Sequence, residues 1–148
     1  SLPLLPLEGL GLEEELGPKR KKRKRDLSGG VAGPSPRVKE LNSTCGGLLK
    51  KLIKKDEDHV FHFPVTPSEA PGYTDIIKRP ICFSEIQEKC RVHGYGTLQE
   101  FAEDVSLVFS NCMTYNQPDT PLWKLAHDMF RTAYISLYRC ARRYSYAL

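Results

Sequence analysis

The chain has 148 residues, of which 40% are hydrophobic and 27% charged, and this composition suits one folded domain with a tail rather than two domains. Its formal net charge is +4, but seven basic residues stand in a single run, 19–25, and the rest of the chain nearly balances its charges. We therefore expect that the domain itself is not a strongly basic nucleic-acid binder.

The five cysteines are an odd set without a CxxC pair, which argues against a disulfide framework and against a four-ligand zinc site. We expect a reducing compartment, no metal and no cofactor. Pro3 and Pro6 interrupt the apolar start and glutamates follow it, which is unlike a signal peptide. No stretch approaches the roughly 20 apolar residues of a membrane span, so we expect no membrane partner.

Residues 1–36 show neither a helical nor a strand period, and we expect a disordered tail. The tail contains one uninterrupted basic run, made of Lys19, Arg20, Lys21, Lys22, Arg23, Lys24 and Arg25. Such a run resembles a nuclear localisation signal and equally a patch that binds phosphate backbones. A solvated run without a dedicated partner is the third alternative.

The first predicted helix begins after Pro36. Its apolar residues recur every three or four positions, and they are Val38, Leu41, Cys45, Leu48, Leu49 and Leu52. Gly46 and Gly47 each cost about 1 kcal/mol relative to alanine inside a helix. We therefore expect the first half of this helix to fray or to begin later.

Residues 56–80 contain Pro64, Pro67, Pro71, Gly72 and Pro80, which exclude a long helix or a central strand. The segment is nevertheless rich in apolar residues. A loop of about 25 residues is uncommon in a compact domain unless it has a function. We predict a long, ordered, functional loop.

Three more helices follow. One is predicted over about 83–92 with Gly94 as its stop, and a capping box, Thr97-Leu98-Gln99-Glu100, opens the next, which ends before Asn116. The last begins with Thr120 as N-cap and Pro121 at the first helical position. Four helices with one long loop and short links predict an all-α fold, a four-helix bundle.

Three segments in this order resemble the bromodomain family. They are Phe61-His62-Phe63-Pro64-Val65, then Ala70-Pro71-Gly72-Tyr73 continuing through Ile76-Ile77-Lys78-Arg79-Pro80, and last Ser110-Asn111-Cys112-Met113-Thr114-Tyr115-Asn116. The likeness covers about 38–138. Within the family, the chain most resembles the subfamily of bromodomain-containing proteins 7 and 9 and, more loosely, the peregrin-type scaffold proteins.

The resemblance implies a left-handed four-helix bundle over 37–143 that reads acetylated lysine and is not an enzyme. It also implies acetylated histone tail peptides as partners, together with subunits of a chromatin-remodelling or acetyltransferase complex, and a nuclear location. The acetylated site and the host complex are left open.

Acetylation converts a strongly hydrated ammonium into a neutral amide on an apolar stem, so a reader needs an apolar slot with one well-placed donor. The side-chain NH2 of Asn116 can supply that donor. Unmodified lysine would lose its hydration there, at a cost of at least several kcal/mol. On spacing alone, however, an Asn between a helix and Pro118 is a turn or C-cap residue, and only the three motifs together favour the binding role.

In the family, the hydroxyl corresponding to Tyr73 acts on the acetyl carbonyl through a water. For Tyr115 we favour a core aromatic with a satisfied hydroxyl, and we leave open whether Phe61 or Phe63 faces the ligand. The expected acetyl-lysine-binding residues are Asn116, Tyr73, Val65, Phe61, Ala70, Tyr115, Leu122 and Val60, and the expected rim residues are Glu69 and Phe63.

The sequence departs from its subfamily around this slot. Val60 replaces an aromatic residue, Glu69 an apolar one and Leu122 a tyrosine, so we expect a shallower, less aromatic pocket. Glu69 could favour ligands with neighbouring basic residues, although a solvated loop charge is the simpler interpretation. Ile81-Cys82 replaces a Met-Asp pair and removes a side-chain N-cap worth about 1 kcal/mol.

The alternative function is a nucleic-acid-binding module that acts through the basic tail, with the helical domain as a protein-interaction scaffold. Even a reader could make a weak DNA contact through this tail. An enzyme is disfavoured, because His59 and His62 lack a carboxylate or Cys pair to complete a metal site and no nucleophile has a convincing base.

Overall fold

The computed structural model describes residues 32–146. The basic run 19–25 and most of the expected tail lie outside these residues, so the predictions made for them remain predictions.

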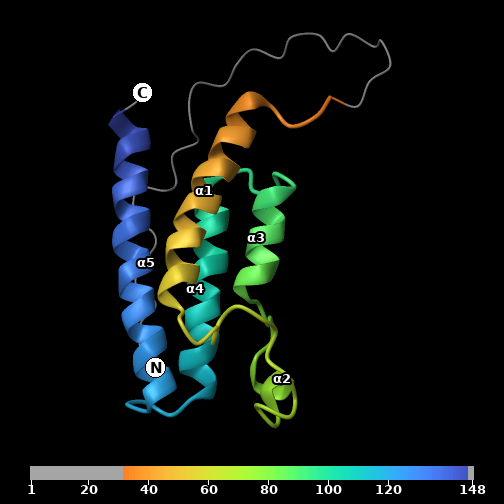
Figure 1. Cartoon of the computed structure of the whole chain (residues 1–148), viewed down its shortest axis with the longest axis vertical. Helices are drawn as coiled ribbons and strands as arrows, with labels where there is room; N and C mark the ends of the chain where they lie inside the picture. Colours follow the sequence, from red (N-terminus) through yellow and green to blue (C-terminus); the bar gives the residue numbers. More distant parts are fainter. Residues whose placement is uncertain (1–31, 147–148) are drawn as a thin grey trace.

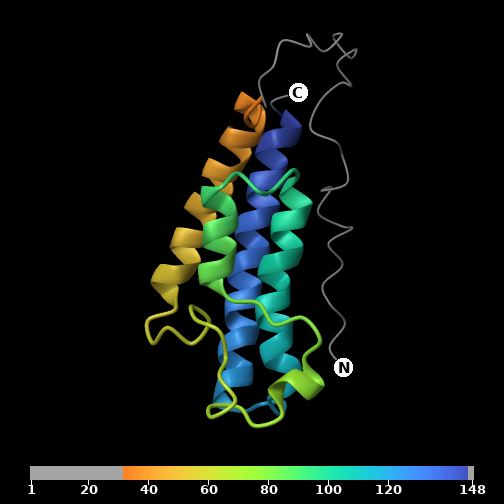
Figure 2. The same cartoon turned by 90° about the vertical axis from the view of Figure 1, so that its right-hand side faces the viewer.

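Residues 32–146 form five helices and no strand. The helices are α1 (Pro36–Lys55), α2 (Tyr73–Ile76), α3 (Phe83–Arg91), α4 (Leu98–Tyr115) and α5 (Pro121–Tyr146). Figures 1 and 2 show α1, α3, α4 and α5 running along the long axis, while α2 is a single turn within the long loop at one end. The predicted all-helical bundle is confirmed, and α2 is a short fifth helix that the pattern of prolines concealed.

Helix α1 begins at Pro36 and continues without a break, contrary to the expectation of a weak first half. Its start is well capped, because the Ser35 side chain accepts a hydrogen bond from the Val38 N–H at 3.3 Å and a proline opens the first turn. Buried Leu41, Cys45 and other residues of one stripe pack into the bundle. This burial outweighs the unfavourable glycines.

The predicted caps of α4 and α3 can be compared directly. Thr97 Oγ1 accepts from the Glu100 N–H at 3.2 Å, as a capping box requires, while the Glu100 carboxylate accepts from the Gly96 N–H. Helix α3 lacks a side-chain cap: Cys82 stands at its N-cap position, and its thiol instead contacts Ser84 and Glu85. The loss predicted from Cys82 is therefore confirmed.

One hydrophobic core lies between the helices, where α4 packs chiefly on α5 and α1 on α3. Its largest fully buried side chains include Phe83, Phe101, Phe109 and Tyr95. Two buried polar groups cross-link it. The Asn42 amide bonds the Tyr95 backbone N–H and C=O, and the Asp104 carboxylate accepts from Tyr95 Oη and Arg79 Nη2, both at 2.7 Å. These two bonds of Asn42 reach the backbone of Tyr95, which lies between α3 and α4, so they fix the α3–α4 connection against α1.

Candidate ligand-binding pocket

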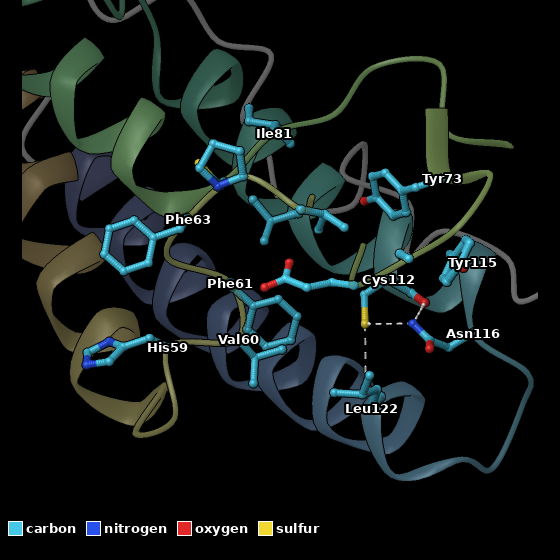
Figure 3. Close-up of a pocket in the computed structure, with 16 residues that line it drawn as sticks. His59, Val60, Phe61, Phe63, Tyr73, Ile81, Cys112, Tyr115, Asn116 and Leu122 are labelled. Atoms are coloured by element: carbon cyan, nitrogen blue, oxygen red, sulfur yellow. Dashed lines mark hydrogen bonds between the residues drawn. The ribbon is translucent and has the colours of Figure 1, made fainter. Parts of the chain in front are cut away.

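A pocket of about 320 Å³ opens at the end of the bundle where the long loop crosses α4 and the start of α5. All ten residues named from the sequence as binding or rim residues line it. They come from the loop, from the last turn of α4 and from the first turn of α5, and Figure 3 shows most of them around the opening. The structure therefore brings the expected residues together, while their role in binding remains a proposal.

Asn116 is the C-cap residue of α4 and leaves the helix with an extended backbone, φ −88° and ψ 146°. Its Nδ2 donates to the Cys112 carbonyl oxygen at 2.9 Å and lies 3.5 Å from Cys112 Sγ (Figure 3). Sulfur is a weak acceptor, so the N–H that faces it can donate to the carbonyl oxygen of a ligand instead, at little cost. The C-cap and the pocket-donor interpretations of Asn116 therefore describe one geometry.

Tyr73 is buried on the opposite wall, at the start of α2. Its hydroxyl makes no hydrogen bond within residues 32–146, although its ring meets that of Tyr115 edge-on at 5.2 Å. Burial raises the pKa of the Tyr73 hydroxyl, and the neighbouring Cys112 adds to the rise. The hydroxyl is therefore protonated at neutral pH and is a donor facing the pocket.

Tyr115 has a different task. Its hydroxyl donates to the Pro71 carbonyl oxygen at 2.9 Å, which ties the loop to the end of α4. The satisfied hydroxyl of Tyr115 agrees with the interpretation favoured from the sequence. Because Pro71 lies two positions before Tyr73, this bond also helps to hold Tyr73 against the pocket.

The exposed fractions of Phe61 and Phe63 show how each ring lies relative to the pocket. Phe61 is buried and packs edge-on against Phe109 with ring centroids 5.3 Å apart, so it closes the floor of the pocket against the core. Phe63 is 61% exposed and packs against the rings of His62 and His59 at the rim (Figure 3). Both therefore line the pocket, one as floor and the other as rim.

The remaining predicted residues complete the walls. Ala70 is buried next to Tyr73, Val60 packs against the core, and Val65 is exposed at the opening. Leu122 is the second residue of α5 and is 44% exposed at the mouth. Glu69 is exposed, and its carboxylate accepts from the Thr66 N–H at 3.1 Å, so it stabilises a turn of the loop.

Asp56 positions the first part of the loop. This carboxylate is 2% exposed, and its two oxygens accept the N–H groups of Val60 and Phe61, both at 2.8 Å. His59 lies between Asp56 and Val60 in the sequence and has a left-handed backbone with φ 53°. The role of Asp56 was not evident from the sequence, because a carboxylate before a loop is usually solvated.

Six further residues line the pocket and were not predicted: His59, Pro64, Ile81, Cys82, Val108 and Cys112. Cys112 is the most informative, because its thiol accepts from Asn116 and lies 3.6 Å from the Leu122 carbonyl oxygen. Burial raises the pKa of this thiol to about 11, so it is neutral at pH 7. Its position four residues before Asn116 on one helix was the available signal.

The described residues 32–146 contain no cluster of three His, Cys, Asp or Glu side chains that could hold a metal ion. In the same range, no helix combines the length and apolar character needed to cross a membrane.

An apolar slot with one amide donor and one hydroxyl defines a binding module for a neutral amide carried on an apolar stem. The bromodomain family model matches residues 45–128, and the chain belongs to this family. Bromodomains are reader modules for acetylated lysine rather than enzymes.

The similarity to bromodomain-containing proteins 7 and 9 is confirmed. Bromodomain-containing protein 7 of Gallus gallus is 39% identical over 92 residues, or 62% of this chain and 14% of that protein. Bromodomain-containing protein 9 of Homo sapiens is 41% identical over 87 residues, 59% of this chain and 15% of that protein. The SWR1 complex bromodomain subunit bdf1 of Schizosaccharomyces pombe is 43% identical over 102 residues, 64% of this chain and 18% of that protein. The matched part is thus less than a fifth of each relative.

Solved structures are similar over more of the chain. The bromodomain of human BAZ1A is 30% identical with a TM-score of 0.62, covering 79% of this chain and 98% of that one. A Leishmania donovani bromodomain complexed with bromosporine is also 30% identical, with a TM-score of 0.61, covering 68% of this chain and 84% of that one.

Proposed function

We propose that this chain binds acetylated lysine in the tails of nuclear proteins, histones among them, and thereby recruits a chromatin-regulating complex. The observation that carries the proposal is Asn116, whose amide has one N–H committed to the Cys112 carbonyl and the other facing only a thiol, opposite the Tyr73 hydroxyl. An acetyl carbonyl entering the slot meets a donor on one wall and a second donor, through water, on the other.

The pocket also discriminates against unmodified lysine. Glu69 is the one carboxylate that lines it, and this side chain is exposed at the rim and already accepts from Thr66. An ammonium would therefore exchange its water shell for apolar walls and two donors, at a cost of several kcal/mol. An acetylated side chain loses far less hydration.

The proposed partners follow from the relatives. One relative is a subunit of the SWR1 complex, and this supports a role in a chromatin-remodelling or acetyltransferase complex and a nuclear location for this chain. The domain over 37–143 would be the reading module, and the basic run 19–25 would be a nuclear localisation signal or a phosphate-binding patch.

Binding to an array of acetylated and unmodified peptides tests the proposal. The parent should bind acetylated peptides above their unmodified controls, Asn116→Ala should lose this binding, and the exposed neighbour variant Gln117→Ala should keep it. Bromosporine, the ligand of the Leishmania donovani structure, should displace bound peptide. Failure of the parent to bind any acetylated peptide above its control, or full binding by Asn116→Ala, would overturn the proposal.

A further inference from the structure

The near-balance of charge in the domain conceals a division between helices. Helices α1 and α5 together carry eleven Lys and Arg residues and two acidic residues, whereas residues 56–120 between them carry four Lys and Arg and eleven Asp and Glu. Figure 1 shows α1 and α5 side by side along one side of the bundle, with α3 and the loop that carries α2 on the other. The domain therefore has a basic side and an acidic side, and the pocket loop belongs to the acidic one.

On the basic side, the most regular spacing of basic residues is found along one face of α5. Arg131, Ile135 and Arg139 follow one another at four-residue steps and are all exposed, and Arg142 continues the same face. From Arg131 to Arg142 this arginine stripe extends about 16 Å at 1.5 Å per residue. The nearest acidic residue on the helix is Asp128, one turn before Arg131.

We propose that the arginine stripe of α5 binds the phosphate backbone of duplex DNA. Arginine recognises phosphate oxygens through paired N–H groups, and a straight stripe of this length spans several phosphates of one strand. Binding of this kind is independent of base sequence.

A duplex suits the stripe better than a single strand does. Proteins that bind single strands stack bases on exposed aromatic rings. Tyr138 is the exposed aromatic residue of the stripe, and the Arg142 guanidinium lies over its ring at 5.9 Å from the centroid. That ring face is therefore covered by the guanidinium and is not open for base stacking.

The position of the stripe is compatible with simultaneous peptide binding. Helix α5 ends, and α1 begins, at the end of the bundle opposite to the long loop that borders the pocket (Figure 1). The stripe can therefore bind a duplex while the pocket stays open.

The test compares two double variants of the full 148-residue chain that lose the same charge. Arg131→Gln with Arg139→Gln alters the stripe, and Lys78→Gln with Arg91→Gln alters exposed basic residues on the loop and α3. Fluorescence anisotropy with a labelled DNA duplex between about 50 and 200 mM KCl gives the affinity and its salt dependence. Acetylated-peptide binding and thermal unfolding of both variants report whether pocket and fold are intact.

We expect the stripe variant to bind DNA roughly tenfold more weakly, with a salt slope shallower by about two, and the loop variant to bind like the parent. Asn116→Ala should keep DNA binding, so the test of DNA binding is independent of the proposed reader function. The proposal is overturned if the parent does not bind the duplex, if the stripe variant binds as tightly as the parent, or if both variants weaken equally. Displacement of the duplex by polyglutamate as readily as by unlabelled DNA would also overturn it and would indicate an acidic protein as partner.

Discussion

Asn116 performs two tasks with one amide group. One N–H donates to the Cys112 carbonyl in the last turn of α4, and the group also lies 3.5 Å from the Cys112 thiol in the pocket. Because the Cys112 carbonyl accepts from both the backbone N–H and the side-chain NH2 of Asn116, the side chain is held in place before any ligand arrives. Rigid placement reduces the entropy that must be lost on binding.

Tyr73 and Tyr115 are a matched pair for testing which hydroxyl acts on the ligand. Tyr73→Phe should weaken acetylated-peptide binding severalfold and leave stability unchanged, because its hydroxyl makes no hydrogen bond within residues 32–146. Tyr115→Phe should instead cost about 1 kcal/mol of unfolding free energy, since it loses the bond to Pro71. Calorimetric titration and urea unfolding of both variants check this, and a stability loss in Tyr73→Phe alone would contradict it.

At the scale of elements, the long loop is ordered because it is anchored at several points. Asp56 holds its beginning, the Tyr115 hydroxyl holds Pro71, and Asn111 Nδ2 donates to the Arg79 carbonyl oxygen at 2.9 Å near its end. Each anchor satisfies a backbone group that would otherwise compete for water. The pocket therefore depends in part on Asp56 and Asn111, two residues that do not line it.

The Asp56 anchor gives the strongest expected effect on the loop. Asp56→Ala should lower the unfolding free energy by about 2–4 kcal/mol, because it removes two charge-assisted hydrogen bonds from a buried position. Peptide affinity should fall as well, since Phe61 loses its placement. Urea unfolding and peptide titration measure both, and the exposed neighbour variant Asp58→Ala, which should change neither, is the control.

Gly47 offers a change of the opposite sign. It lies within α1, is exposed, and an added Cβ would meet no atom within 4 Å. Gly47→Ala should therefore raise the unfolding free energy by about 0.5–1 kcal/mol through helix propensity alone, with ligand binding unchanged. Thermal unfolding of the parent and the variant measures the shift. A lower melting temperature would show that the glycine serves a packing role not evident in α1.

Periodicity predicted the four long helices to within a few residues, because each buries one apolar stripe and carries local start signals such as Thr97 and Pro121. The α2 turn was missed, because four residues are too few to show a period. The continuity of α1 was underestimated, since helix propensity counts Gly46 and Gly47 but not the burial of Leu41 and Cys45. Long-range packing decided that segment.

For the pocket, Asn116, Tyr73 and loop residues such as Phe61 could be located from the sequence, because each of them lies within one of the three contiguous motifs. Val108 and Ile81 were missed because their place in the pocket depends on how α4 and the loop meet in space. The division of charge was hidden for the same reason: α1 and α5 are adjacent in the bundle but far apart in the chain.

At the scale of the whole molecule, buried thiols couple folding to pH. Burial raises the pKa of Cys90 and of Cys112 to about 11, and it raises that of Cys45 further. The unfolded chain releases these protons near pH 9, whereas the folded chain holds them until about pH 11, so their contribution to stability is full below pH 9 and is lost above it.

We therefore expect the unfolding free energy to fall between pH 9 and 11, by up to about 1.4 kcal/mol per pH unit for each thiol. Urea unfolding across this range measures the decline, and Cys90→Ala should make it shallower. A free energy that stays constant up to pH 11 would contradict the burial of these groups.

In the proposed complex, the side-chain amide of Asn116 donates to an acetyl carbonyl. The most direct measurement is the NMR signal of that NH2 group, identified by its absence in Asn116→Ala, during titration with an acetylated peptide and with its unmodified counterpart. We expect a downfield shift of one of the two protons with the acetylated peptide and no shift with the unmodified peptide. Saturating binding of the acetylated peptide that leaves this signal unchanged would contradict it.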